Sequence, residues 1–367
     1  LDLTQDYLKS KKINVDKKAF DSKMFEQKQR ARKNWKGSGD VIDDKILFDS
    51  LRDIEETDFL GYNKDLTQSI ILKIILNEKD SKNALKGQKA YIILNQTTFY
   101  GESGGQVGDT GFLYNDDFKF LVNNTTKIFG DYFIHWGRVI KGTCKIQDQI
   151  IASINADRRT LIRNNHSSTH LLHASLRKIL GKHVSQKGSL VNEEKLRFDF
   201  SHNDSIDDIS IIKIENMVNS IIDTNVLVNT QILDHKTAIE SGAMALFGEK
   251  YGDEVRVVSM GNDSDNEIFS KELCGGTHVK KTGDINIFKI INQSSVASGV
   301  RRIEAVTNIG VEKYNLLEIE NKTKLDNNLI KEINKYSKLI DGMKLNKIFE
   351  INSKIDLEEN LKLIKIF

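Results

Sequence analysis

The strongest constraint on the fold of this chain comes from two pairs of potential metal ligands more than a hundred residues apart. His166 and His170 are spaced i, i+4, so they lie on one face if that segment is helical. Cys274 and His278 lie in the segment Cys-Gly-Gly-Thr-His, where glycine lets the backbone turn sharply. One thiolate and three imidazoles form a four-ligand set of the kind that zinc prefers. If all four bind one ion, two distant segments must meet in the folded protein.

Neither pair is a specific signal by itself. A histidine pair with this spacing is common by chance, and the Cys-x-x-x-His pair is similarly weak. Their occurrence together is stronger, because the chain has only two cysteines and eight histidines. The four residues are therefore predicted to be zinc ligands, with ordinary helix and loop side chains as the alternative.

Composition limits the classes of protein to which the chain can belong. At 367 residues it predicts two or three folded units, and no apolar stretch is long enough to predict a membrane span. Two cysteines do not form a disulfide framework, and a reducing cytoplasm would leave Cys274 free to bind metal. The net charge of +2 predicts that any RNA contact comes from local basic patches, of which 28–36 and 157–163 are candidates. The opening Leu1, without an initiator methionine, predicts a piece of a longer chain.

The order of sequence patterns predicts an α+β protein with four parts. Residues 1–60 are predicted to be helical, 65–155 to form a small β-barrel, 156–310 to form an α+β unit, and 311–367 to form a helical or coiled-coil arm. Within the α+β unit the predicted elements are a helix from Ala156 that carries the histidines and has its apolar stripe in 163–180, a helix at 206–223, and strands 195–200, 254–259 and 285–291. The segment 97–111 is too glycine-rich for regular structure, so it is predicted to be a loop that exposes backbone N–H groups.

Several longer segments resemble the editing domain of alanyl-tRNA synthetases. The resemblance is carried by Phe269–Val279, which contains the second ligand pair, and by Ser294–Ala305. The segments 97–111 and 241–253 are similar to further motifs of this family, and 32–40 is similar to the helical region after its aminoacylation core. Threonyl-tRNA synthetases and freestanding editing proteins share the two ligand pairs but are not expected to carry 32–40. Thr98 stands where the family usually has proline, and the whole chain contains no proline.

The resemblance implies zinc-dependent hydrolysis of mischarged Ser-tRNA(Ala) and Gly-tRNA(Ala), in a parent enzyme that attaches alanine to tRNA(Ala). The class II motifs that bind ATP are missing, so ATP and Mg²⁺ are expected only in the absent aminoacylation core, and this chain is not expected to aminoacylate. No catalytic residue is assigned, and a metal-bound water is the expected nucleophile. Four protein ligands would make a structural zinc site and three a catalytic one, and the sequence does not choose between them. A cytoplasmic location and self-association through the C-terminal arm are also predicted.

The resemblance also suggests residues that contact the substrate. Thr97, Gln106, Gly104 and Gly105 are predicted to bind the amino acid, because they lie in the glycine-rich motif. The alternative is that Thr97 caps a turn and Gln106 bonds its own loop.

Arginines are the predicted contacts for tRNA phosphates, because the guanidinium group matches phosphate oxygens. The candidates are Arg301, Arg302, Arg158 and Arg159. Arg302 could instead pair with Glu304. His173 is expected to be packed or capped rather than a fifth ligand.

Two other functions fit the same motifs. One is a zinc-stapled RNA-binding module without hydrolysis, for which metal removal would unfold the protein and no deacylation would be seen. The other is a freestanding hydrolase that edits mischarged tRNA in trans, which the segment 1–60 disfavours.

Overall fold

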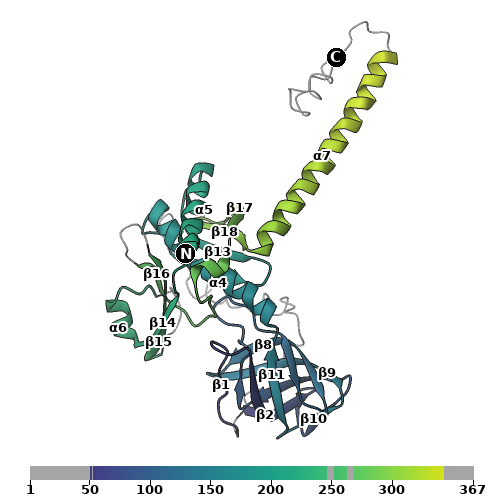
Figure 1. The fold of residues 1–367 in the computed structure, drawn as a ribbon, viewed down its shortest axis with the longest axis vertical. Helices are drawn as coiled ribbons and strands as arrows, with labels where there is room; N and C mark the ends of the chain where they lie inside the picture. Colours follow the sequence, from purple (N-terminus) through teal and green to yellow (C-terminus); the bar gives the residue numbers. More distant parts are fainter. Residues whose placement is uncertain (1–49, 52, 246–251, 263–267, 343–367) are drawn as a thin grey trace, which may run out of the picture.

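A computed structural model describes residues 50–245 except 52, together with 252–262 and 268–342. The architecture is α+β, as predicted: a β-barrel and an α+β unit lie next to each other, and a long helix projects from the unit (Figure 1). Of the helical segment predicted for 1–60, residues 1–49 and 52 lie outside the described residues, and the prediction is wrong at its end, where 58–59 form a strand. The arm beyond 342 also lies outside the described residues. No helix among the described residues is long and apolar enough to cross a membrane.

The barrel is a six-stranded antiparallel sheet closed on itself. Its strand order is β11-β7-β8-β9-β5-β2, and a further pairing between β11 and β2 closes the ring. The strands are β2 (Leu66–Leu76), β5 (Lys89–Leu94), β7 (Gly111–Tyr114), β8 (Lys119–Ile128), β9 (Tyr132–Lys141) and β11 (Gln149–Ile154). Alternate side chains point inward, so Ile150, Ala152 and Ile154 of β11 are buried while their neighbours are not. The closed ring explains the predicted series of short, alternating apolar runs.

Short strands extend the barrel. They are β3 (Lys79–Ser81) beside β2, β4 (Asn83–Leu85) paired with β10 (Thr143–Lys145), and β1 (Asp58–Phe59) paired in parallel with β6 (Gln96–Thr97). The predicted loop follows β6. Gly104 and Gly105 there have φ angles of 58° and 85°, which L-residues rarely adopt. A Cβ on Gly105 would lie 2.7 Å from the Ser189 carbonyl oxygen, so this loop packs tightly on the α+β unit.

Helix α4 (Ala156–Leu180) connects the barrel to the α+β unit. It begins at Ala156, as predicted, because the Asn155 side chain caps it by accepting a hydrogen bond from the Arg158 N–H. It ends at Gly181, which has a φ of 118°. The helix buries an unusual run of polar side chains from Asn164 to Thr169, together with His170 and His173. Burial of so many polar groups indicates that this helix carries a site.

The main sheet of the α+β unit is antiparallel and packs against two helices. Its order is β12 (Gln186–Val191), β13 (Leu196–Ser201), β18 (Val300–Thr307) and β17 (Phe288–Ala297). The helices are α4 and α5 (Asp208–Asp223), which starts after the capping residue Asp207. The strand predicted at 285–291 is wrong at its start: 282–285 form a 3-10 turn, and Asn286 at φ 70° separates it from β17.

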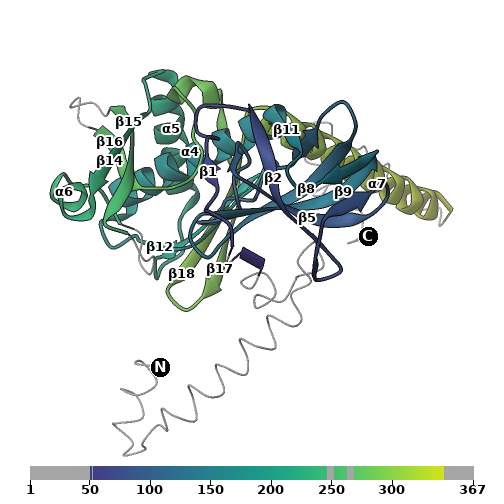
Figure 2. The ribbon, with the colours of Figure 1, turned by 90° about the horizontal axis from the view of Figure 1, so that it is seen from below.

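A smaller sheet leads into the loop that carries the second ligand pair, Cys274 and His278. It contains β14 (Asn229–Asp234), β15 (Glu254–Asn262) and β16 (Ile268–Leu273), and helix α6 (His235–Glu240) packs beside it. Figure 2 shows this sheet on one side of α4 and the barrel on the other. The loop after β16 therefore enters the space next to α4. Helix α7 (Ile309–Gly342) follows β18 and exposes Leu316, Leu317 and Leu325.

Candidate metal centre

The structure brings the four predicted ligands to one point. One ligand atom from each of His166, His170, Cys274 and His278 lies within 4.8 Å of every other. Cys274 Sγ is 3.5 Å from His166 Nε2 and 3.3 Å from His278 Nε2. In a tetrahedral zinc site with ordinary Zn–S and Zn–N lengths, sulfur and nitrogen are separated by about 3.6 Å. The donor set and these two distances fit one tetrahedral ion.

Hydrogen bonds from neighbouring side chains fix the orientation of two of the imidazoles. His166 Nδ1 lies 2.7 Å from Gln106 Oε1, which also accepts from the Thr277 N–H at 2.9 Å. His278 Nδ1 lies 3.2 Å from Ser167 Oγ. In both rings the Nδ1 atom is occupied, so Nε2 is left facing the thiol. Metal-binding histidines in proteins are generally oriented in this way by a second group.

The third imidazole is oriented by a buried carboxylate. Glu272 is 2% exposed, and its two oxygens lie 2.7 Å from His170 Nδ1 and 3.0 Å from His173 Nδ1. His170 Nε2 is buried without a hydrogen-bond partner among the described residues. Such an atom costs free energy unless something binds it, and an ion at the centre would do so. His173 is packed beside the site, as predicted, and contributes no atom to the cluster.

The charges of the cluster also suit a metal. Burial would raise the pKa of Cys274, but the imidazoles of His166, His278 and His170 outweigh it and hold that pKa well below its usual value. Burial lowers the pKa of His278 to about 3, so its ring is neutral and keeps a lone pair. Burial would also lower the pKa of His170, but Glu272 and Cys274 raise it to about 10. Without metal a proton therefore sits on His170, and binding of an ion would release it.

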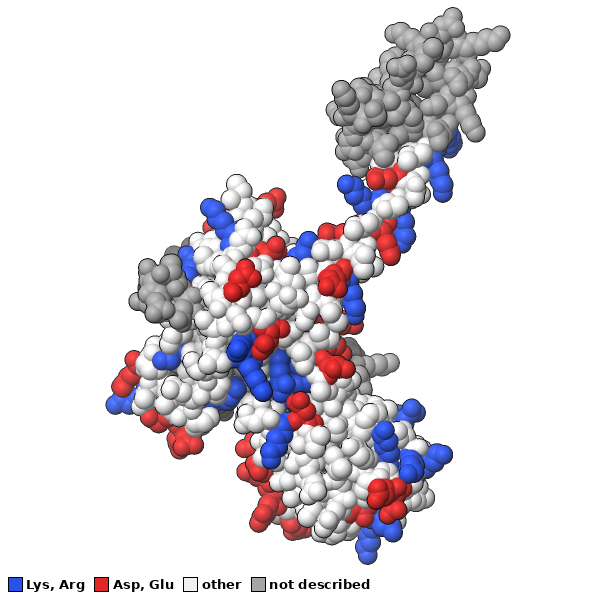
Figure 3. Space-filling view, in the orientation of Figure 1, with Lys and Arg blue, Asp and Glu red and all other residues white. Residues whose placement is uncertain are grey.

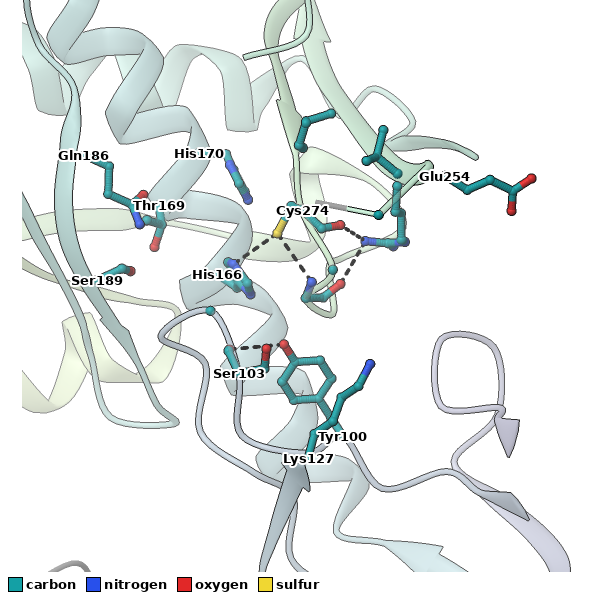
Figure 4. A pocket seen from close by; sticks show the side chains of 17 residues that line it. Tyr100, Ser103, Lys127, His166, Thr169, His170, Gln186, Ser189, Glu254 and Cys274 are labelled. Carbon is teal, nitrogen blue, oxygen red and sulfur yellow. Dashed lines mark hydrogen bonds between the residues drawn. The ribbon is translucent and has the colours of Figure 1, made fainter. Parts of the chain in front are cut away.

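A cavity of about 520 Å³ opens onto three of the four donors (Figure 4). Its polar walls come from separate segments: Ser103 from the barrel loop, Thr169 from α4, and Gln186 and Ser189 from β12. Gly104 of the barrel loop and the segment Cys274–Gly276 also line it. The cavity lining also includes the charged residues Lys127, Glu254 and Arg256.

Comparison with known proteins gives the family. Residues 1–158 match the family of class II (A) tRNA synthetases, and residues 255–304 match the second additional domain of threonyl and alanyl tRNA synthetases. The chain is 46% identical to the alanine–tRNA ligase of Chelativorans sp. over 318 residues, 45% to that of Parvibaculum lavamentivorans over 317, and 48% to that of Wolbachia pipientis over 314. These alignments cover 84% to 86% of the chain.

The chain belongs to the alanyl-tRNA synthetase family. It spans 34% to 36% of the length of these three relatives.

Two of the predicted substrate contacts of this synthetase fragment are wrong in the structure. Thr97 and Gln106 are both completely buried, and neither lines the cavity. The Thr97 hydroxyl lies 2.8 Å from His135 Nε2 and accepts from the Phe99 N–H, so it does cap a turn. The Gln106 side chain bonds His166 and Thr277 of other segments rather than its own loop. Of the two predicted glycines, Gly104 lines the cavity and Gly105 packs on Ser189.

Arg159 is not available to a tRNA phosphate, which corrects the prediction for this residue. Its side chain is fully buried and forms an ion pair with Asp109. Its remaining N–H groups donate to the carbonyl oxygens of Gly61 at 2.7 Å and Thr98 at 2.9 Å. The guanidinium group joins α4 to the barrel, which a basic run in the sequence does not distinguish from a surface patch.

The other predicted arginines lie nearer the surface. Arg302 makes a two-pronged ion pair with Asp199 at 2.7 and 2.8 Å, so the alternative pairing with Glu304 is wrong. Arg158 pairs with Glu193 at 2.9 Å, and Arg301 is partly exposed. Figure 3 shows basic and acidic side chains interspersed where the barrel meets the α+β unit. A phosphate would have to compete with these carboxylates for Arg158 and Arg302.

Sequence reasoning missed the residues that orient the ligands. Glu272 precedes Cys274 by two positions, so the period of a strand places both on one side, and this spacing was an available signal. Ser167 adjoins a ligand but looks like any helical serine. Arg256 lies 18 positions from Cys274, and its contact with that residue depends on the pairing of β15 with β16.

Proposed function

We propose that this chain is the editing part of an alanyl-tRNA synthetase and hydrolyses the ester bond of seryl- and glycyl-tRNA(Ala). The observation that carries the proposal is the four-donor cluster, three of whose members line a cavity that also contains polar side chains such as Ser103 and Ser189. The resemblance of the barrel motif and of the ligand segments to the family's editing domain supports the same substrate class. The parent enzyme would attach alanine to tRNA(Ala), and aminoacylation is not proposed for this fragment.

Zinc is the proposed metal, held by His166, His170, Cys274 and His278. The mixture of one thiolate and three imidazoles is a set that zinc favours over magnesium or calcium, which prefer oxygen ligands. A zinc ion held by all four residues would leave no position for water, so it would join the helix to the loop and supply a positive charge that orients the substrate. Gln106, Ser167 and Glu272 would keep the imidazole Nε2 atoms aimed at the ion.

The polar lining of the cavity would select the amino acid. An aminoacyl ester is already activated, so the site has to position the ester and a water molecule rather than perform difficult bond chemistry. Ser103 and Ser189 line the cavity, and their hydroxyl groups would hydrogen-bond a small polar substituent such as the serine hydroxyl, whereas the Thr169 hydroxyl donates to the Asn165 carbonyl oxygen. Alanine lacks that hydroxyl and would leave cavity groups unpaired, which disfavours its hydrolysis.

Partner and location follow from the same proposal. Local contacts by partly exposed arginines such as Arg301, rather than the net charge of +2, would bind tRNA phosphates. The exposed leucines of α7 are the proposed surface for self-association. A reducing cytoplasm would keep the Cys274 thiol available.

The test is deacylation of Ser-tRNA(Ala) and Ala-tRNA(Ala) by the whole chain, with and without a zinc chelator. The expected result is zinc-dependent hydrolysis that favours the seryl ester by at least about 100-fold. Cys274→Ala should remove the activity, and Cys144→Ala is the matched control because Cys144 is buried in the barrel. Zinc binding without any hydrolysis would contradict the proposal and favour an RNA-binding module stapled by zinc.

A further inference from the structure

Two side chains outside the ligand set donate hydrogen bonds to the loop that carries Cys274. Arg256 Nη1 donates hydrogen bonds to the carbonyl oxygens of Cys274 at 2.8 Å and Gly276 at 2.9 Å. The Tyr62 hydroxyl donates to the carbonyl oxygen between them, that of Gly275, at 2.7 Å. The two side chains also contact each other, with Arg256 Cζ 4.3 Å from the centre of the Tyr62 ring. We call Arg256 and Tyr62 the clasp.

The clasp fixes the direction of the backbone N–H groups in the loop. A peptide unit is planar, so its N–H points away from its carbonyl oxygen. With the Gly275 carbonyl held by Tyr62, the Gly276 N–H faces Cys274 Sγ at 3.4 Å. With the Gly276 carbonyl held by Arg256, the Thr277 N–H donates to Gln106 Oε1 at 2.9 Å. The loop therefore presents its N–H groups to the thiolate and to the side chain that orients His166.

The clasp is itself anchored on both sides. The Arg256 carbonyl oxygen accepts from the Cys274 N–H at 2.9 Å, which ties this residue to the loop through the backbone as well. Tyr62 follows Gly61, whose carbonyl oxygen accepts from Arg159 of α4 at 2.7 Å. A Cβ on Gly61 would lie 2.2 Å from the Thr98 carbonyl oxygen, so this segment is packed without room to shift. The clasp connects the ligand loop to the helix that supplies the other two ligands.

We infer that Arg256 and Tyr62 are positioning residues that hold the Cys274–Gly276 loop in its metal-binding conformation. Two consecutive glycines give the free loop many backbone conformations, of which few would aim Cys274 Sγ at the imidazoles. The inference rests on the proposed function only in taking the four donors as zinc ligands, and it does not require hydrolysis. Groups that orient metal ligands typically change affinity by 10- to 100-fold when they are removed.

The experiment measures zinc affinity of the whole chain by competition with a chromogenic chelator. Arg256→Ala should weaken zinc binding about 10- to 100-fold, and Arg256→Lys should restore part of it because one donor can still reach a carbonyl oxygen. Tyr62→Phe removes only the hydroxyl group, so a smaller loss is expected. In the cobalt-substituted protein, Arg256→Ala should also change the thiolate-to-cobalt absorption, because the geometry at Cys274 changes.

The chain offers matched controls for both variants. Arg177 Nη1 also donates to two carbonyl oxygens, those of Lys182 at 2.9 Å and Val184 at 2.6 Å, at the far end of α4. The Tyr132 hydroxyl likewise donates to one carbonyl oxygen, that of Ile54 at 3.1 Å. Arg177→Ala and Tyr132→Phe should therefore leave zinc affinity and the cobalt spectrum unchanged.

Unchanged zinc affinity and cobalt absorption in Arg256→Ala would overturn the inference. If that variant instead lost tRNA binding in a salt-dependent manner, Arg256 would be a phosphate contact. If Arg256→Ala did not fold, Tyr62→Phe would decide, and wild-type zinc affinity in that variant would overturn the inference. Weakened zinc binding in the clasp variants of a chain without deacylase activity would support the clasp and contradict the proposed function.

Discussion

The barrel and the α+β unit each contain one cysteine, but the two surroundings have opposite effects on the thiol. Cys144 in β10 is surrounded by apolar side chains, and burial raises its pKa to about 11. Cys274 is also in a desolvated position, yet three imidazoles hold its pKa well below the usual value. The first is an inert part of the core and the second a thiolate. Neighbouring charges, rather than burial alone, decide which cysteine can bind metal.

The histidines of the two regions differ in the same way. Burial lowers the pKa of His135 in the barrel to about 4, although a hydrogen bond to the Ile92 carbonyl oxygen opposes the shift. At His170 burial acts in the same direction, but Glu272 and Cys274 raise the pKa to about 10. The barrel keeps a neutral histidine as a packing group, while the α+β unit keeps its histidine next to charges that an ion can balance.

The largest expected contrast is between the two cysteines. Cys274→Ala should lower the zinc content from about one ion per chain to nearly none, while Cys144→Ala should keep the ion and cost only about 1 kcal/mol of stability. Elemental analysis and thermal melts of both purified variants provide the measurement. In chelator-treated protein, a thiol reagent at neutral pH should modify Cys274 first and Cys144 only after unfolding. Equal loss of zinc in both variants would contradict the prediction that only Cys274 binds the metal.

A second contrast is the pH dependence of the barrel. The unfolded chain binds a proton at His135 near the ordinary histidine pKa of 6.5, whereas the folded protein keeps this ring neutral to about pH 4. Between these values the unfolded state binds more protons, so stability should fall as the pH is lowered, by about 3 kcal/mol at pH 4. Urea unfolding monitored by Trp136 fluorescence between pH 7 and pH 4 measures this loss, because Trp136 adjoins His135 on β9.

The variant His135→Gln should show a shallower pH dependence than the original chain. His235→Gln is the control, because His235 is exposed. Identical curves for the original chain and His135→Gln would show that the histidine titrates normally in the folded barrel.

The smallest expected contrast separates two residues that the sequence placed in one substrate pocket. Gln106→Ala should weaken zinc binding about 10-fold, because His166 loses the group that orients it. Thr97→Val should leave zinc binding unchanged and cost about 1–3 kcal/mol, because it removes the hydrogen bonds of the Thr97 hydroxyl to His135 and to the Phe99 N–H, neither of which involves a ligand. Zinc affinity and urea unfolding of both variants distinguish these effects. If Gln106→Ala changed the ratio of seryl to alanyl hydrolysis and left zinc affinity unchanged, Gln106 would contact the substrate rather than orient a metal ligand.

Much of the fold was predictable because its signals are local. Alternating apolar residues predicted strands that close into the barrel, and the i, i+4 pair placed His166 and His170 on one helical face. The boundaries were less accurate where a single side chain decides them. Asn286 separates the 3-10 turn from β17, so this strand starts later than expected.

The sequence by itself determined the types of ligand available and the family, because both depend on residue identity and spacing. The tertiary structure decided which polar residues support the ligands and which ones line the cavity. Gln106, Glu272 and Arg256 act on side chains or carbonyl groups of other segments, so their partners are known only once strands and loops have paired. In the sequence Arg159 resembles a surface cation, but in the structure it is buried in an ion pair with Asp109. A hydrogen bond depends on distance and direction in space, and spacing along the chain fixes these only within a single helix, strand or turn.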